Sequence, residues 1–222
     1  MSYNFDFQVL LPYWPQLLWG CWMTLCLAAL SVALGFLIGL LAAVSRNSMI
    51  VWLRWVAVGY VELIRNTPFL LQIFFIFFGL PTLGVSLSPW PAAVLALSLN
   101  CGAFASEIIR QGIDSIPRGQ LEAGRALGLN AAIIFRYIVL KPALRIIFPA
   151  LAGQFILALL TTSIVSSISA EELTSIAQSI DTVTFRSFEI YFTITLLYFI
   201  MSYVFASIFK LITKQFFSYP MK

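Results

Sequence analysis

Two pairs of oppositely charged residues recur at the same spacing within apolar sequence. Glu62 and Arg65 are three residues apart, and so are Glu107 and Arg110. Residues at this spacing share one face of a helix, so each carboxylate can neutralise its guanidinium. Ionisable groups in an apolar environment are costly, and they are usually paired or functional. We expect each pair to have a structural or gating role, with ligand binding as the alternative.

Uncharged polar residues form a second set. They are Ser98 and Asn100 in one apolar stretch, and Thr161, Ser163 and Ser166 in another. In a membrane, such groups can line the path of a polar solute. Their hydroxyl groups can equally bond to the preceding turn of their own helix. Both interpretations stay open.

Glu172 follows the second of these stretches, with Glu171 beside it. A carboxylate here can attract a cationic solute, cap a helix that begins near Leu173, or contact another protein. We include Glu172 with the pathway candidates.

Residues for catalysis or metal binding are missing from the sequence. It has no histidine, and Cys21, Cys26 and Cys101 match no metal or redox spacing. No G-x-x-x-x-G-K-[ST] phosphate loop occurs either. We therefore predict no metal site, no cofactor and no enzymatic activity for this chain.

The composition predicts an integral membrane protein. Of the 222 residues, 61% are hydrophobic and only 10% charged, against about 25% charged in soluble domains. Long charge-free stretches fit helices of about 20 residues that cross a bilayer. We predict a single all-α domain over residues 1–222 with five membrane-spanning helices, near 16–44, 55–79, 89–109, 146–168 and 188–212. The first span is expected to be retained, because Asp6 stands where a signal peptide has basic residues.

Basic residues predict the orientation of these spans. Eleven of the thirteen fall on one side, between spans one and two, between spans three and four, and after span five. Basic loops stay in the cytoplasm, so the N-terminus should lie outside and the C-terminus inside. The positive charge therefore reflects topology, and we expect no nucleic-acid partner.

The segment from about 111 to 145 is the largest polar stretch on the predicted cytoplasmic side. Leu121, Leu127, Ile134 and Ile138 recur at near-helical spacing, and Gly128 divides the pattern into two short helices. A helix of this kind can dock in a groove of a partner protein or lie on lipid headgroups. The periodicity alone does not choose between them.

Glu122-Ala123-Gly124, followed by Leu127 and Gly128, resembles the EAA loop of bacterial ATP-binding-cassette (ABC) importers. Gly124 departs from that pattern by replacing its third small residue. Lys141 also departs from it, since a proline is expected there and Pro142 comes one position later. The resemblance implies that Glu122, Ala123, Gly124, Leu127 and Gly128 form a helix that couples the chain to an ATPase.

Three further segments resemble the permeases for histidine, glutamine, arginine and opines. They are the stretch from Tyr60 to Pro68, the stretch from Glu107 to Gln120, and the serine-rich run from Ser163 to Thr174. All are in the order and spacing of that family, over roughly residues 16–215. The chain is thus similar to a type I importer permease for polar amino acids in a bacterial inner membrane.

This resemblance implies several partners. They are ABC ATPase subunits that carry ATP and magnesium, a second permease subunit (identical or related), an extracytoplasmic solute-binding protein, membrane lipid and a small polar amino acid. Two rival interpretations are a self-contained secondary transporter, which would need no ATPase, and a membrane scaffold with no transport role. Co-purification with an ATPase and substrate-stimulated ATP hydrolysis distinguish them.

Overall fold

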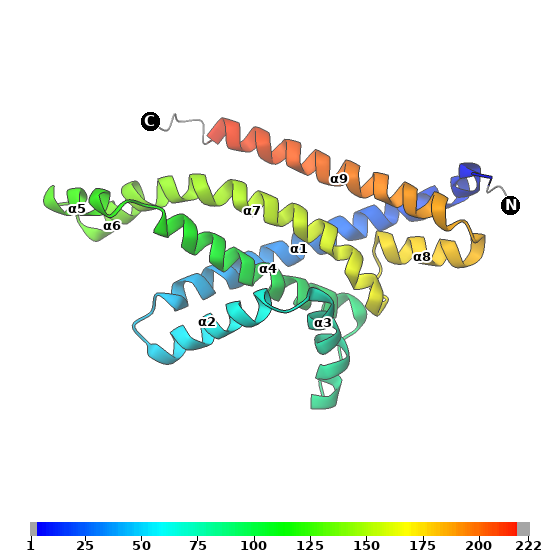
Figure 1. Cartoon of the computed structure of the whole chain (residues 1–222), viewed down its shortest axis with the longest axis horizontal. Coiled ribbons are helices and arrows are strands. Elements are labelled where there is room, and N and C mark those ends of the chain that lie inside the picture. The colour runs from blue at the N-terminus through cyan, green and yellow to red at the C-terminus, as the bar shows by residue number, and fades with distance from the viewer. Residues whose placement is uncertain (1–3, 217–222) are drawn as a thin grey trace.

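A computed structural model describes residues 4–216, and within them every regular element is a helix (Figure 1). In chain order the elements are η1 (Phe7–Tyr13), α1 (Trp14–Arg46), α2 (Val51–Arg65), α3 (Phe69–Phe74), η2 (Phe75–Gly79), η3 (Leu80–Leu83), α4 (Pro89–Asp114), α5 (Arg118–Ala126), α6 (Ala131–Ile133), η4 (Ile134–Leu140), α7 (Lys141–Thr161), η5 (Thr162–Ile168), α8 (Leu173–Thr184) and α9 (Ser187–Phe216). Four helical runs are long and apolar enough to cross a membrane, or five if one bent pair counts as a span. The predicted all-helical membrane fold is confirmed at this level.

Helix α1 packs closely along α4 because glycines face the contact. A Cβ atom on Gly39 would lie 2.7 Å from the Cβ of Ala105 and 2.8 Å from the main-chain oxygen of Gly102. Gly35 lies four residues earlier and faces Cys101 in the same way. This is the small-xxx-small arrangement that lets membrane helices approach backbone to backbone. The pair α1–α4 therefore forms the framework on which the other helices pack.

The predicted second span is not a continuous helix. Helix α2 ends at Arg65, and the segment Phe69–Leu83 leaves it at a bend of 113°. Pro68 causes the break, since it has no N–H to donate and disfavours a helical conformation at Thr67. The prediction of one span over 55–79 is therefore wrong in detail, and five spans result only if the bent pair counts as one.

The predicted fourth span begins earlier than expected. A helical run extends from Ala131 to Ile168, whereas the prediction began at 146. Much of the segment predicted as a cytoplasmic loop is therefore the first part of this run. The break predicted at Gly128 is confirmed, because α5 ends at Ala126 and Gly128 has a φ of +73°.

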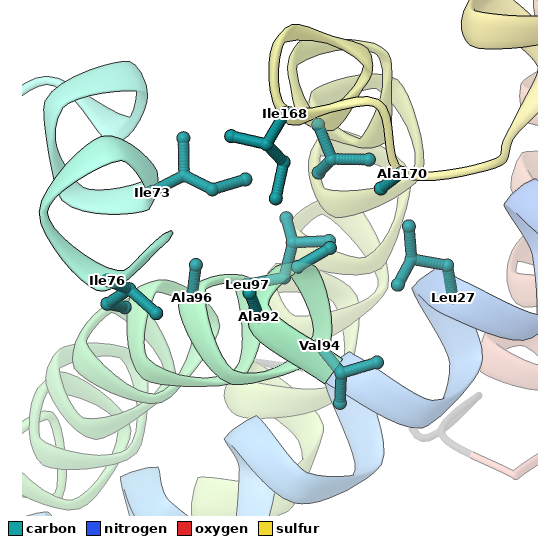
Figure 2. Packing of buried hydrophobic residues seen from close by; sticks show 11 residues of the cluster. Leu27, Ile73, Ile76, Ala92, Val94, Ala96, Leu97, Ile168 and Ala170 are labelled. Atoms are coloured by element: carbon teal, nitrogen blue, oxygen red, sulfur yellow. The ribbon is translucent and has the colours of Figure 1, made fainter. Parts of the chain in front are cut away.

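The break in the second span and the end of the fourth helical run both pack on α4. Figure 2 shows Ile73 of α3 and Ile168, the last residue of η5, beside Leu97 of α4, with Ile76 of η2 in the same cluster. Leu27 of α1 completes this buried cluster. Packing against one helix thus brings the bent second span and the end of the fourth run together.

Short elements lie at the two opposite ends of the molecule. Helices α5 and α6 lie at one end, and η1 and α8 lie at the other (Figure 1). Hydrogen bonds close the second end, since the main-chain N–H of Asp6 donates to Glu189 and Arg186 donates to the main-chain oxygen of Asn4. The long helices between the two ends carry the exposed apolar side chains, which suits a lipid environment.

Candidate functional site

Helix α5 presents most of the predicted coupling residues on the surface. Glu122, Ala123, Leu127 and Gly128 are exposed, and Leu127 retains 78% of its accessible surface. A shallow hollow of about 340 Å³ lies beside them, between α5 and the run that begins at α6. An exposed leucine next to a hollow gives this end of the molecule the features of a protein docking site.

The end of α5 is defined by Gly128. Its main-chain N–H donates to the oxygen of Arg125 at 2.9 Å, and the N–H of Leu129 donates to the oxygen of Gly124 at 3.1 Å. This pair of hydrogen bonds is a Schellman motif, which requires the left-handed conformation that glycine adopts without cost.

Gly124 is the buried member of the coupling set. A Cβ atom there would lie 2.7 Å from Cδ1 of Ile138. Because α5 packs so closely on η4, the departure from the EAA pattern has a structural reason. Glycine at this position lets α5 pack directly against η4.

Glu107 lies at the centre of the charged residues. Its carboxylate accepts from Arg46 of α1 at 2.8 Å and from Arg110 at 2.5 Å, and Arg65 of α2 lies 3.6 Å away. Glu107 is almost fully buried. Arg110 also contacts Asp114 at 2.6 Å. The geometric prediction for Glu107 and Arg110 is confirmed, and the cluster joins α1, α2 and α4.

The predicted pair of Glu62 and Arg65 does not form among the described ion pairs. Glu62 is exposed and accepts a hydrogen bond from Asn66 at 3.1 Å, whereas Arg65 is directed toward Glu107 and lies over the ring of Phe104. The spacing permits the local pair, but the packing of α2 on α4 offers Arg65 a buried carboxylate. Sequence reasoning also missed Arg46, which it assigned only to a basic loop.

Asn100 has a partner at the break between α2 and α3. Its side-chain amide donates to Oε1 of Gln72 at 3.0 Å. The amide of Gln72 in turn donates to the main-chain oxygens of Ile64 at 2.8 Å and Thr67 at 3.0 Å. These oxygens lie near the interrupted end of α2 and would otherwise be left unsatisfied. Gln72 was missed, although it is the only amide between Pro68 and Asn100 in the sequence.

Ser98 differs from Asn100. It is buried, and its hydroxyl has no hydrogen-bond partner within the described residues. It lines an apolar hollow of about 410 Å³ between α1 and α4, away from the Gln72–Asn100 contact.

The hydroxyl groups near η5 bond to their own helix. Thr161 donates to the oxygen of Leu157, Ser163 to that of Leu160, and Ser166 to that of Ser163, at 2.7–2.8 Å. The geometry therefore matches the alternative of bonding to the preceding turn. The oxygen lone pairs remain available, and Ser166 already accepts a weak hydrogen bond from Gln178 at 3.4 Å.

Glu172 caps α8 from a fully buried position. Its carboxylate accepts from the main-chain N–H of Ser175 at 2.8 Å and from the hydroxyl of Tyr198 at 2.5 Å, and Thr24 donates at 3.5 Å. Burial raises the pKa of Glu172, and the hydrogen bond from Tyr198 partly opposes this. The capping interpretation is confirmed in geometry. Of the two glutamates, Glu171 is the exposed one, and it accepts from Trp19.

The sequence from residue 35 to 217 matches the family of binding-protein-dependent transport system inner membrane components. The chain belongs to this family. It is accordingly a multi-pass inner-membrane protein, as the sequence predicted. Residues 35–217 begin at the glycine pair of α1 and include every candidate residue, so the site lies wholly within the family domain.

Relatives in this family are named as amino-acid permeases. The chain is 43% identical over 168 residues to the L-cystine transport system permease protein TcyB of Bacillus subtilis, which covers 76% of this chain and 72% of TcyB. It is 36% identical over 214 residues to the glutamine transport system permease protein GlnP of Escherichia coli, covering 96% and 98%. The nopaline transport system permease protein NocM of Agrobacterium fabrum is 36% identical over 209 residues, covering 90% and 87%.

Solved structures agree with this family. A chain from the crystal structure of an amino acid ABC transporter with histidines superposes with a TM-score of 0.91 at 38% identity, covering 96% of this chain and 100% of that one. The MetNI methionine ABC transporter gives a TM-score of 0.74 at 23% identity, covering 92% and 98%, and shows the shared fold. The architecture is therefore that of a type I ABC importer permease.

Proposed function

We propose that this chain is the permease subunit of an ABC importer for a polar amino acid. The N-terminus lies outside the cell and the C-terminus in the cytoplasm. Support for the orientation comes from the sequence, in which eleven of the thirteen basic residues fall between spans one and two, between spans three and four, and after span five. Support for the substrate class comes from relatives named for L-cystine, glutamine and nopaline.

Helix α5 is the coupling helix in this proposal, and its exposure is the observation that carries the function most directly. It is short, ends at a defined cap and presents Leu127 and Glu122 at the cytoplasmic end of the molecule. A separate ATPase subunit binds this helix, holds ATP and magnesium, and performs the hydrolysis. The chain itself is not an enzyme.

The translocation pathway is formed with a second permease subunit, identical or related. Asn100, held by Gln72 at the interrupted second span, is the polar group we place nearest the substrate. Ser98 and the hydroxyls of Thr161, Ser163 and Ser166 complete the candidate set. An extracytoplasmic solute-binding protein delivers the amino acid at the end formed by α8, where Glu172 holds that helix in place.

ATP hydrolysis by the complex tests the proposal. The permease is purified in lipid with the ATPase that accompanies it, and amino acids are presented one at a time on the binding protein. We expect one polar amino acid to stimulate hydrolysis. Transport by the chain alone, with no ATPase bound, would show a secondary transporter instead, and a bound ATPase that no amino acid stimulates would show a scaffold.

A further inference from the structure

An apolar groove runs along the cytoplasmic half of α1. It has a volume of about 720 Å³ and lies between α1, α4 and the run from η4 into α7. Leu40 and Val44 form one wall, Leu144 and Ile147 the other, and Ile109 lies on α4 between them. No element among the described residues covers Leu40, Val44 or Leu144, which retain about 40–65% of their accessible surface.

A second cavity of about 360 Å³ continues the groove toward the membrane centre. The two share Phe36, Phe148 and Leu151, and the second extends to Val32 of α1. From Val44 to Val32 the combined groove follows twelve residues of helix, or about 18 Å at 1.5 Å per residue. The hydrocarbon of one leaflet is about half of a 30 Å core. The groove is thus long enough to cross one leaflet.

Polar groups occur chiefly at the mouth of the larger cavity. Ser45, Asn47 and Ser48 lie there, at the connection between α1 and α2. One exposed basic residue, Arg54, directly follows the groove residue Leu53 in the sequence. Lys141 follows Leu140, but its ammonium lies over the ring of Tyr137, outside the groove. The groove therefore matches a molecule with a long apolar part and a polar end that carries a negative charge.

We propose that this groove binds one acyl chain of a phospholipid, with the phosphate at the mouth near Arg54. A zwitterionic amino acid does not suit these apolar walls. An acyl chain in the groove gives the apolar side chains that line it the dispersion contacts that they lack when the groove is empty. Assignment to the cytoplasmic leaflet rests on the proposed orientation of the chain, whereas lipid binding itself does not.

Native mass spectrometry of the permease–ATPase complex, purified in a delipidating detergent and then given phosphatidylglycerol, tests the groove. We expect one retained phospholipid per permease chain. The double variant Leu40→Trp/Leu144→Trp fills the groove from both walls. Losing contact with as few as two methylene groups lowers affinity about tenfold, so occupancy should fall by at least that factor.

The matched control is Leu196→Trp/Leu211→Trp on α9. Both leucines are exposed and line neither cavity, so this variant should retain the lipid. Equal retention by wild type and the groove variant would overturn the proposal, as would a wild-type complex that retains no lipid. Stimulated ATP hydrolysis, measured on the same samples, reports on the transport function separately.

The phosphate position is tested by competition with phosphatidylcholine. Wild type should prefer phosphatidylglycerol, because the net negative charge of this lipid is attracted to Arg54 at the mouth. The variant Arg54→Gln should lose that preference and keep the bound acyl chain. An unchanged preference would overturn the headgroup assignment.

Discussion

Asn100 of α4 donates a hydrogen bond of 3.0 Å to the side-chain oxygen of Gln72 in α3. The other end of the same glutamine amide satisfies main-chain oxygens of Ile64 and Thr67 at the break in the second span. One buried side chain therefore closes an interrupted helix and holds a candidate pathway residue. The interruption and this candidate residue are therefore parts of one local structure.

Replacing this glutamine should destabilise the protein. In Gln72→Leu the oxygens at the break and the amide of Asn100 lose their partner, which costs about 2 kcal/mol. For a protein of this size that corresponds to a decrease in Tm of about 4–8 °C, which thermal unfolding of the purified complex measures. Gln178→Leu removes an exposed amide from α8 and should change Tm little. Equal effects of the two changes would contradict the role of Gln72.

Glu107 should be the charged residue on which the packing of α1, α2 and α4 against one another depends. Glu107→Gln removes the carboxylate that Arg46, Arg65 and Arg110 share, and we expect a loss of about 1.5–3 kcal/mol in the free energy of unfolding. In a double-mutant cycle, Arg46→Gln should cost less in the Glu107→Gln background than in wild type.

The control for this cycle is Glu62→Gln. Because Glu62 is exposed and bonds only to neighbouring Asn66 among the described contacts, its replacement should be nearly neutral. A large effect of Glu62→Gln, with coupling to Arg65, would instead restore the pairing that the sequence predicted.

The α1–α4 contact should not tolerate a methyl group. In Gly39→Ala the new Cβ would lie 2.8 Å from the main-chain oxygen of Gly102, which cannot rotate away. We expect a loss of about 1–3 kcal/mol in stability. Gly59→Ala is the matched control, since no atom lies within 4 Å of the added Cβ and alanine favours a helix. Thermal unfolding measures the Tm of both variants. A lower Tm for Gly59→Ala than for Gly39→Ala would contradict this packing.

Glu172 should make stability depend on pH. Its pKa in the folded protein is raised by burial, so folded protein holds a proton that unfolded protein has released. The stabilisation is complete below the unfolded pKa and is lost as the pH rises through the folded pKa. Wild-type Tm should therefore decrease from acidic to neutral pH, and Glu172→Gln should reduce that decrease. The exposed Glu171→Gln is the control, and an identical pH profile for Glu172→Gln would contradict the argument.

Local signals in the sequence were enough for some features of this protein. Charge-free stretches located the spans, and Gly128 located the end of α5, because a left-handed cap depends on one residue type. Pro68 was also visible in the sequence, but the bend that it causes in the second span was not predicted, because the apolar composition continues unchanged across it. The spans were therefore predicted better than the path of the chain within them.

Tertiary contacts account for what the sequence could not predict. Arg65 pairs with Glu107 across 42 positions of sequence and Arg46 across 61, and neither spacing carries a periodic signal. The sequence left three roles open for Glu172, because its burial depends on Tyr198 and Thr24 from other elements.

Gly128→Asp tests most directly whether α5 couples this permease to an ATPase. Aspartate at a φ of +73° strains the cap and adds a charge beside Leu127. Gly84→Asp makes the same change at another glycine with positive φ, outside α5. We measure substrate-stimulated ATP hydrolysis of the reconstituted complex. The account predicts loss of stimulation or of the bound ATPase in Gly128→Asp alone, and normal stimulated hydrolysis in that variant would contradict it.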